Sequence, residues 1–277
     1  MTHAARSATD DPSRLAQGGF AEHIAHLKRS AAKMGLSSSD AFEAVEVRTA
    51  EELRCCDGLI IPGGESTAMA LIAEEWKLFE PLRAFVAEKP VWGTCAGMIF
   101  LANGIHGSKI GGQTLVGGID VTVHRNIFGR QISSFETVMA TPDAIASSSE
   151  DPAASFRGVF IRAPAILLDP APPASVETLA VLELSEPLPL VASDANSATV
   201  SSVAVAARQR HILVTAFHPE LTEDTCWHSL FIGMARDHAQ KGEGGKEGAA
   251  KTPAKTNVAY PASPLPLAVR EDLPIFA

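Results

Sequence analysis

A cysteine between two glycines is the first place in the sequence where residue types and spacing suggest chemistry. Residues 93–97 read Gly-Thr-Cys-Ala-Gly, directly after the apolar pair at 91–92. This G-x-nucleophile-x-G pattern is typical of a tight strand-to-helix turn that lifts the nucleophile above a sheet edge. The glycines avoid Cβ clashes, and the following helix favours a Cys95 thiolate and leaves the Ala96 N–H for an oxyanion. The alternative is a buried, unreactive cysteine.

A histidine followed two positions later by a glutamate can supply the base that a cysteine nucleophile needs. The stretch Val-Thr-Ala-Phe-His-Pro-Glu ends an apolar run at His218 and Glu220. Residues i and i+2 of an extended backbone face the same side, so Glu220 can orient the His218 ring. Together with Cys95 this predicts a Cys-His-Glu triad. In isolation, the pair would be a loop histidine beside a surface glutamate. The remaining histidines are interpreted as surface or helix residues.

Two further stretches carry groups that suit substrate binding. The glycine-rich turn at 61–67 (Ile-Pro-Gly-Gly-Glu-Ser-Thr) lacks the lysine of a phosphate-binding loop, and Ser66 or Thr67 is predicted to cap the next helix. The stretch 124–136 concentrates arginines, and Arg162 follows a predicted strand. Arginine grips carboxylates well, although a surface ion pair is its more frequent role. The turn itself could equally be only a tight connection.

The elements that must position these residues alternate between strands and helices. Helical spacing is predicted at 20–35, 65–88, 96–105 and 223–241. Apolar or alternating runs predict strands at 42–49, 57–64, 90–94, 118–123, 158–164, 202–208 and 211–217. This alternation predicts an α/β fold of three layers, with a mostly parallel sheet and helices on both faces.

The sequence also predicts how the chain is divided. An irregular segment at 1–16 precedes a domain at 17–240. Surface insertions are expected near 147–155 and 169–175, which are rich in Ser, Pro and Ala. The low-complexity tail at 241–277 is predicted to be disordered.

Composition narrows the class of protein. The chain has 277 residues, 46% of them hydrophobic, and a formal net charge of −9, which argues against a nucleic-acid surface. Nothing at the start of the sequence resembles a signal peptide, and no apolar run approaches the roughly 18 residues of a membrane span, so no membrane is expected. A cytoplasmic setting follows, with the four cysteines as thiols. Their spacing suits no zinc site, so no metal is expected.

Five blocks in order along the chain resemble the glutaminase-subunit family of pyridoxal 5′-phosphate synthase. They are LIIPGGESTAM, GTCAG, RNIFGRQISSFE, VFIRAP and FHPELTED, within about residues 17–238. This family belongs to the class I, triad-type glutamine amidotransferases, so the resemblance implies their flavodoxin-like fold. It further implies hydrolysis of L-glutamine to glutamate and ammonia. The ammonia would pass to a PdxS/SNZ-type synthase subunit that builds pyridoxal 5′-phosphate, and no metal or organic cofactor is required.

The resemblance also implies a role for each matching residue. Cys95 is the implied nucleophile, His218 the general base and Glu220 its orienting carboxylate. The implied oxyanion hole is formed by Gly64 and Ala96. The implied substrate contacts are Gly63, Gly64, Glu65, Arg125, Ile161 and Arg162.

The chain departs from the family at its front. Residues 17–23 resemble the turn that follows the family's first strand, but 9–16 read Thr-Asp-Asp-Pro-Ser-Arg-Leu-Ala, which is no strand. A missing central strand would leave its neighbours with unpaired backbone groups, at roughly 1–3 kcal/mol for each buried group. Two alternatives therefore stand beside the glutaminase. One is a non-catalytic or impaired subunit variant, and the other is a different Cys-dependent hydrolase.

Overall fold

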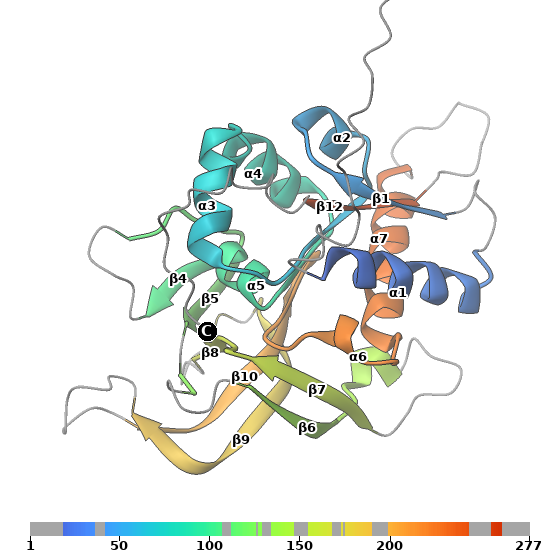
Figure 1. The fold of residues 1–277 in the computed structure, drawn as a ribbon. Helices are drawn as coiled ribbons and strands as arrows, with labels where there is room; N and C mark the ends of the chain where they lie inside the picture. Colours follow the sequence, from blue (N-terminus) through green and yellow to red (C-terminus); the bar gives the residue numbers. More distant parts are fainter. Residues whose placement is uncertain are drawn as a thin grey trace, which may run out of the picture.

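A twisted mixed sheet forms the centre of the protein (Figure 1). The computed structural model describes residues 19–36, 42–106, 112–125, 127–128, 134–146, 155–167, 173, 175–189, 199–243 and 256–261. One half of the sheet is parallel. In spatial order its strands are β1 (Phe42–Val47), β12 (Thr256–Pro261), β2 (Gly58–Ile61), β3 (Val91–Thr94) and β11 (Ile212–Thr215).

The other half of the sheet is mixed. Its strands, continuing from β11, are β10 (Thr199–Gln209), β8 (Ala165–Ile166), β5 (Ile119–His124) and β4 (Ala102–His106), with β9 (Glu177–Pro189) also paired to β10. A separate antiparallel pair is formed by β6 (Ser134–Ala140) and β7 (Ser155–Ile161). The α/β class is as the alternation in the sequence predicts.

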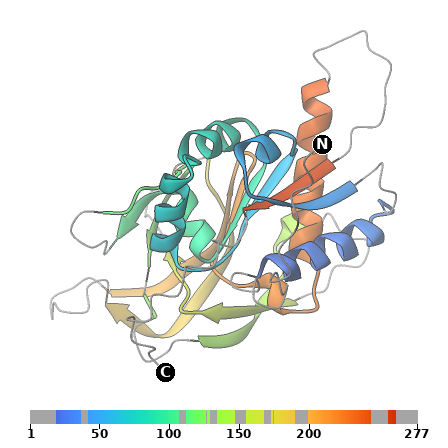
Figure 2. The same cartoon turned by 45° about the horizontal axis from the view of Figure 1, so that its top comes forward.

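Helices cover both faces of the sheet, as Figures 1 and 2 show. On one face α1 (Phe20–Lys33) packs against α7 (Cys226–Glu243). The other face carries α3 (Ser66–Glu75), α4 (Phe79–Glu88) and α5 (Ala96–Leu101). The short helices are α2 (Ala50–Arg54), α6 (Asp143–Ala146) and the 3-10 turn η2 (Pro219–Leu221). Within the described residues, no helix combines the length and apolarity that crossing a membrane requires.

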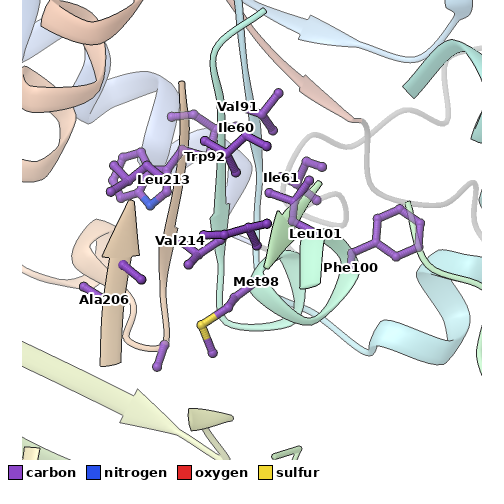
Figure 3. Close-up of a cluster of buried hydrophobic side chains, with 14 of the residues drawn as sticks. Ile60, Ile61, Val91, Trp92, Met98, Phe100, Leu101, Ala206, Leu213 and Val214 are labelled. Carbon is purple, nitrogen blue, oxygen red and sulfur yellow. The ribbon is translucent and has the colours of Figure 1, made fainter. Parts of the chain in front are cut away.

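The core lies around the three central strands β2, β3 and β11, which are buried along their whole length. Parallel strands covered on both faces read as continuous apolar runs, which is the pattern these segments have. Figure 3 shows Trp92 and Leu213 side by side in this core and Met98 of α5 next to Val214, and each of these four side chains is fully buried.

The C-terminal tail contributes a strand that the sequence does not predict. Residues 256–261, expected to be disordered, form β12 between β1 and β2 (Figures 1 and 2). Val258 is paired with Ala44 on one side and with Gly58 on the other, both in parallel register. The place expected to be empty in the sheet is therefore occupied from the opposite end of the chain. The segment 1–16 lies outside the described residues.

Two of the predicted helices are divided or shortened in the structure. The single helix predicted at 65–88 is two helices, because Lys77 adopts a positive φ of 54° and Pro81, in the first turn of α4, has no N–H for a continuous helix. The helix predicted at 96–105 ends at Leu101, and β4 begins directly after it. Most of both predicted insertions, at 147–155 and 169–175, lies outside the described residues.

Candidate active site

Cys95 occupies a strained turn between β3 and α5. Its φ of 48° and ψ of −105° are unusual for a residue with a side chain, and its side chain is 7% exposed. A Cβ on Gly93 would lie 2.5 Å from the backbone carbon of Gly97, and a Cβ on Gly97 would overlap the carbonyl oxygen of Ile61. Only glycine fits at either flank. The tight strand-to-helix turn that the sequence predicts at 93–97 is present.

His218 and Glu220 lie side by side where β11 leads into η2. His218 Nδ1 donates to Glu220 Oε1 at 2.7 Å, and the glutamate side chain is 1% exposed. The backbone N–H of His218 donates to the carbonyl of Val159 in β7 at 2.8 Å, which holds the loop against the second sheet. The predicted i, i+2 pairing of ring and carboxylate is therefore present.

The turn at Gly63 brings the histidine and the cysteine together. A Cβ on Gly63 would lie 2.5 Å from His218 Cε1 and 3.4 Å from Cys95 Cβ. Gly63 thus faces both side chains at contact distance. The structure brings together the residues that the sequence placed in the predicted triad, although they come from distant segments of the chain.

Neighbouring groups determine the charges at this site. Burial alone would lower the pKa of His218, but its hydrogen bonds to Cys95 and Glu220 raise that pKa to about 10. Burial would raise the pKa of Glu220, but the adjacent His23 and His218 hold it well below its usual range. The geometry therefore favours an ionised Glu220 beside a protonated imidazole, which is the partner that a cysteine thiolate needs.

The glycine-rich turn is organised by Glu65 and Arg125. Glu65 is the N-cap of α3, accepting from the N–H of Thr67 and of Ala68 at 3.1 and 2.6 Å, so the predicted capping by Ser66 or Thr67 is wrong. Burial opposes ionisation of Glu65, but these backbone hydrogen bonds outweigh it and lower its pKa. Arg125 Nη2 donates to Ser66 Oγ at 2.8 Å and lies 3.6 Å from Glu65 Oε1. The glutamate side chain is longer than that of serine or threonine and carries two oxygens, so it can accept from two N–H groups at once.

The remaining predicted residues lie around this turn and the end of β7. Gly64 has a φ of 147°, which favours glycine, and Ala96 is buried at the start of α5. Ile161 ends β7 and is 40% exposed, and Arg162 follows with a positive φ of 44°. Two residues before Ile161, β7 accepts the hydrogen bond from His218, so this strand leads towards the site. Within the predicted arginine-rich block, Asn126 and 129–133 lie outside the described residues.

The geometry agrees with a comparison to known families. The model of the SNO glutamine amidotransferase family matches residues 15–237. The chain belongs to this family. The resemblance seen in the five sequence blocks is thus confirmed at the level of the family.

Curated relatives and a solved structure are similar to this family member over most of their length. An Arabidopsis thaliana protein named "Probable pyridoxal 5′-phosphate synthase subunit PDX2" is 47% identical, covering 94% of this chain and 96% of the relative. The Saccharomyces cerevisiae "Pyridoxal 5′-phosphate synthase subunit SNO1" is 44% identical, over 78% and 88%. A crystal structure titled as a glutamine amidotransferase is 34% identical with a TM-score of 0.58, over 79% and 95%.

Three buried histidines beside the site were missed by the sequence reasoning. His23, His26 and His228 were interpreted as surface or helix residues, and all three are helical but 4% exposed or less. The buried face of α1 combines the apolar Leu27 and Ala31 with the polar His23, His26 and Ser30. The i, i+3, i+7 spacing of His23, His26 and Ser30 is the signal that identifies this polar face.

Proposed function

We propose that this family member is the glutaminase subunit of a pyridoxal 5′-phosphate synthase. The observation that carries the proposal is the strained Cys95 turn facing a His218–Glu220 pair across Gly63. Family membership and the names of its relatives support the substrate, L-glutamine, and the process that uses the ammonia. In this proposal Cys95 is the nucleophile, His218 the acid and base, and Glu220 the group that orients the histidine.

The first half of the reaction forms a thioester. The Cys95 thiolate attacks the side-chain amide carbon of glutamine, and the carbonyl oxygen takes up the negative charge beside the N–H groups of Gly64 and Ala96. Protonated His218 then gives its proton to the amide nitrogen, which leaves as ammonia. Because its pKa is raised, the His218 ring carries at neutral pH the proton that this step requires.

The second half releases glutamate. His218, now neutral, takes a proton from water as the water attacks the thioester carbon. The C–S bond breaks, glutamate leaves and Cys95 returns to the thiolate. Ionised Glu220 accepts from Nδ1 throughout and so keeps Nε2 directed at the reacting atoms. Each step uses only side chains of this chain and water.

Substrate binding is assigned to the turn and to the two arginines. Arg125 and Arg162 supply positive charge for the α-carboxylate of glutamine, and Glu65 supplies negative charge for its α-amino group. Gly63 and Gly64 provide close approach of the backbone, and Ile161 contributes an apolar wall. The position of Arg125 over the start of α3 supports this assignment.

The partner is proposed to be a PdxS/SNZ-type synthase subunit that receives the ammonia. The printed names of the relatives as synthase subunits support a partner of this kind. The same proposal places the protein in the cytoplasm, where thiols stay reduced, and all four of its cysteines are free thiols.

The nucleophile assignment is tested by Cys95→Ala with Cys55→Ala as the matched control. Cys55 is an exposed thiol far from the predicted site in sequence, so its loss leaves glutamine turnover unchanged. Cys95→Ala is expected to lower glutamate and ammonia release by roughly a thousandfold or more, because no thioester forms. Both variants are assayed with an authentic synthase subunit. Unchanged turnover in Cys95→Ala contradicts the assignment.

The same assay separates the alternatives raised by the sequence. A folded chain that binds the synthase subunit but releases no ammonia supports a non-catalytic subunit. Turnover of an ester or peptide but not of glutamine supports another Cys-dependent hydrolase. The argument for an impaired subunit came from the absent first strand, and β12 supplies a paired backbone in the sheet between β1 and β2.

A further inference from the structure

A second histidine lies against the far oxygen of the Glu220 carboxylate. Oε1 accepts from His218, while Oε2 lies 3.2 Å from Nε2 of His23, with both side chains at 1% exposure or less. His23 comes from α1, and Thr94 Oγ1, next to the cysteine, lies 3.5 Å from the same ring nitrogen. The carboxylate is thus placed between two imidazole rings, and only one of them belongs to the predicted triad.

The second ring nitrogen of His23 meets a third histidine. His23 Nδ1 lies 2.8 Å from Nε2 of His228 in α7, and both side chains are fully buried. Trp92 of β3 packs edge-on against both rings, with centroids at 5.7 and 5.0 Å. These contacts fix the planes of the two imidazoles, so the line His228–His23–Glu220–His218 ends at the Cys95 site.

The nitrogen that carries the proton on each ring of this line follows from His228, the residue at its far end. Complete burial keeps the pKa of His228 well below its usual value, so the ring is neutral and carries one proton. His228 Nδ1 has no hydrogen-bond partner among the described residues. A proton there would be a buried donor without an acceptor, whereas a proton on Nε2 leaves only an unused lone pair, which is tolerated more often.

The remaining protons follow in sequence. With its proton on Nε2, His228 donates to Nδ1 of His23, which must therefore be unprotonated. The His23 proton is then on Nε2, where it faces Glu220 Oε2. Glu220 in turn offers Oε1 to the Nδ1–H of His218. The contacts at the two ends of the line are hydrogen bonds, and the central contact from His23 Nε2 to Glu220 Oε2 is a 3.2 Å ion-pair contact without hydrogen-bond geometry in this structure.

We propose that His23 is a positioning residue for Glu220 and that His228 sets the tautomer in which His23 does this. The proposal rests on the proposed catalytic role of Cys95, His218 and Glu220. A donor on Oε2 prevents rotation of the carboxylate about its terminal bond and so keeps Oε1 aligned with the His218 ring. His23 touches the carboxylate and not the substrate turn, so its loss affects the rate of chemistry rather than glutamine binding.

The test compares three variants in the complex with an authentic synthase subunit. His23→Leu removes the donor, whereas His23→Gln keeps an N–H at the length needed to reach Oε2. His23→Leu is expected to lower kcat about tenfold, the effect of roughly one hydrogen bond to a charged group, with KM within about twofold. His23→Gln is expected to recover most of the loss.

His26→Leu is the matched control for burial. His26 is equally buried in the same helix, but its ring contacts the carbonyls of Thr222 and Glu22 rather than Glu220. Its loss is expected to lower the urea midpoint of unfolding while leaving the kcat of the folded protein unchanged. An equal loss of kcat in His26→Leu and His23→Leu overturns the proposal, since the effect is then general destabilisation.

Nitrogen-15 spectra of the histidine rings in the wild-type protein test the tautomers without any substitution. Protons on Nε2 of both His23 and His228 support the proposal, and a proton on Nδ1 of His228 overturns it. This measurement decides the matter even if the His23 variants fail to fold.

Two failures are distinguishable. Turnover that survives Cys95→Ala shows that the proposed active site is wrong. If Cys95→Ala is inactive while His23→Leu keeps the kcat of the wild type, with or without a change in KM, the site is right and the positioning role is wrong.

Discussion

At the residue scale, the site depends on glycines as much as on its reactive side chains. Gly93 and Gly97 leave no room for a Cβ at the cysteine turn, and Gly63 leaves none beside the His218 ring. These positions let a strained Cys95 backbone and a histidine from another segment approach closely. Strain of this kind persists only where the surrounding structure holds the residue in place, and strained residues cluster at active sites and ligand-binding sites.

Gly63→Ala tests this close approach. The new Cβ would lie 2.5 Å from His218 Cε1, so the ring must move away from Cys95. A displacement of about 1 Å costs on the order of a hundredfold in rate, so kcat for glutamine is expected to fall by that factor. Gly233→Ala is the control, because a Cβ there meets nothing within 4 Å and turnover stays unchanged. A Gly63→Ala protein with the wild-type kcat shows that the ring has room to spare.

At the element scale, the C-terminal strand β12 supports the part of the fold that carries α1 and Glu220. β12 pairs with β1 along six residues and with β2 at Val258 and Ala259. β1 packs against α1, and α1 also packs against α7 and η2, which carries Glu220. Without β12, β1 loses its only strand partner among the described residues, and the support of α1 beside Glu220 weakens.

Truncation after Glu243 removes β12 and tests this connection. Several backbone groups of β1 and β2 lose their partners at roughly 1–3 kcal/mol each, so Tm is expected to fall by more than about 10 °C, with loss of turnover. Truncation after Pro261 keeps the strand and is expected to keep both. Equal Tm values for the two truncated proteins would show that the strand contributes nothing.

A point substitution tests the same strand in the full chain. Val258→Pro removes an N–H and fits poorly between two strands, whereas Val258→Thr keeps the N–H and a β-branched shape. Thermal unfolding is expected to show a lower Tm for the proline variant alone, because a backbone group left unpaired costs roughly 1–3 kcal/mol of stability. A proline variant as stable as the threonine variant would mean that residue 258 is not in a sheet.

At the scale of the whole molecule, the pair His218 and Glu220 makes the stability of the fold depend on pH. The pKa of His218 rises from 6.5 to about 10 on folding, so its stabilising contribution is complete below about pH 6.5 and lost as pH rises through 10. Glu220 shifts the other way from 4.5, so its contribution is present above that value and lost as pH falls. Both stabilising contributions are therefore complete only between about pH 4.5 and pH 6.5.

Glu220→Gln removes both contributions, and urea unfolding at several pH values measures the result. The free energy of unfolding of the wild type is expected to exceed that of the variant most between about pH 4.5 and 6.5, by about 3 kcal/mol. The difference narrows towards acid and towards pH 10. Glu51→Gln, in an exposed ion pair, serves as control and gives a small difference. A Glu220→Gln difference that stays constant up to pH 10 contradicts the coupling of the two groups.

The sequence by itself determined the features that depend on a few neighbouring residues. The cysteine turn requires glycine at 93 and 97, the glutamate must be two positions from His218, and the buried strands are continuous apolar runs. Backbone sterics and side-chain alternation act over about five residues, so they can be read directly from the order of residues.

Only the tertiary structure decided which distant groups meet. Nothing local in Thr256–Pro261 shows that it will lie between β1 and β2, because strand pairing depends on which edges the rest of the fold leaves open. Likewise His23 and His228 are 205 positions apart, and each alone is an ordinary helical histidine. They become one buried line to Glu220 because α1 and α7 pack together over the same face of the sheet, which excludes water and brings His23 Nδ1 within 2.8 Å of His228 Nε2.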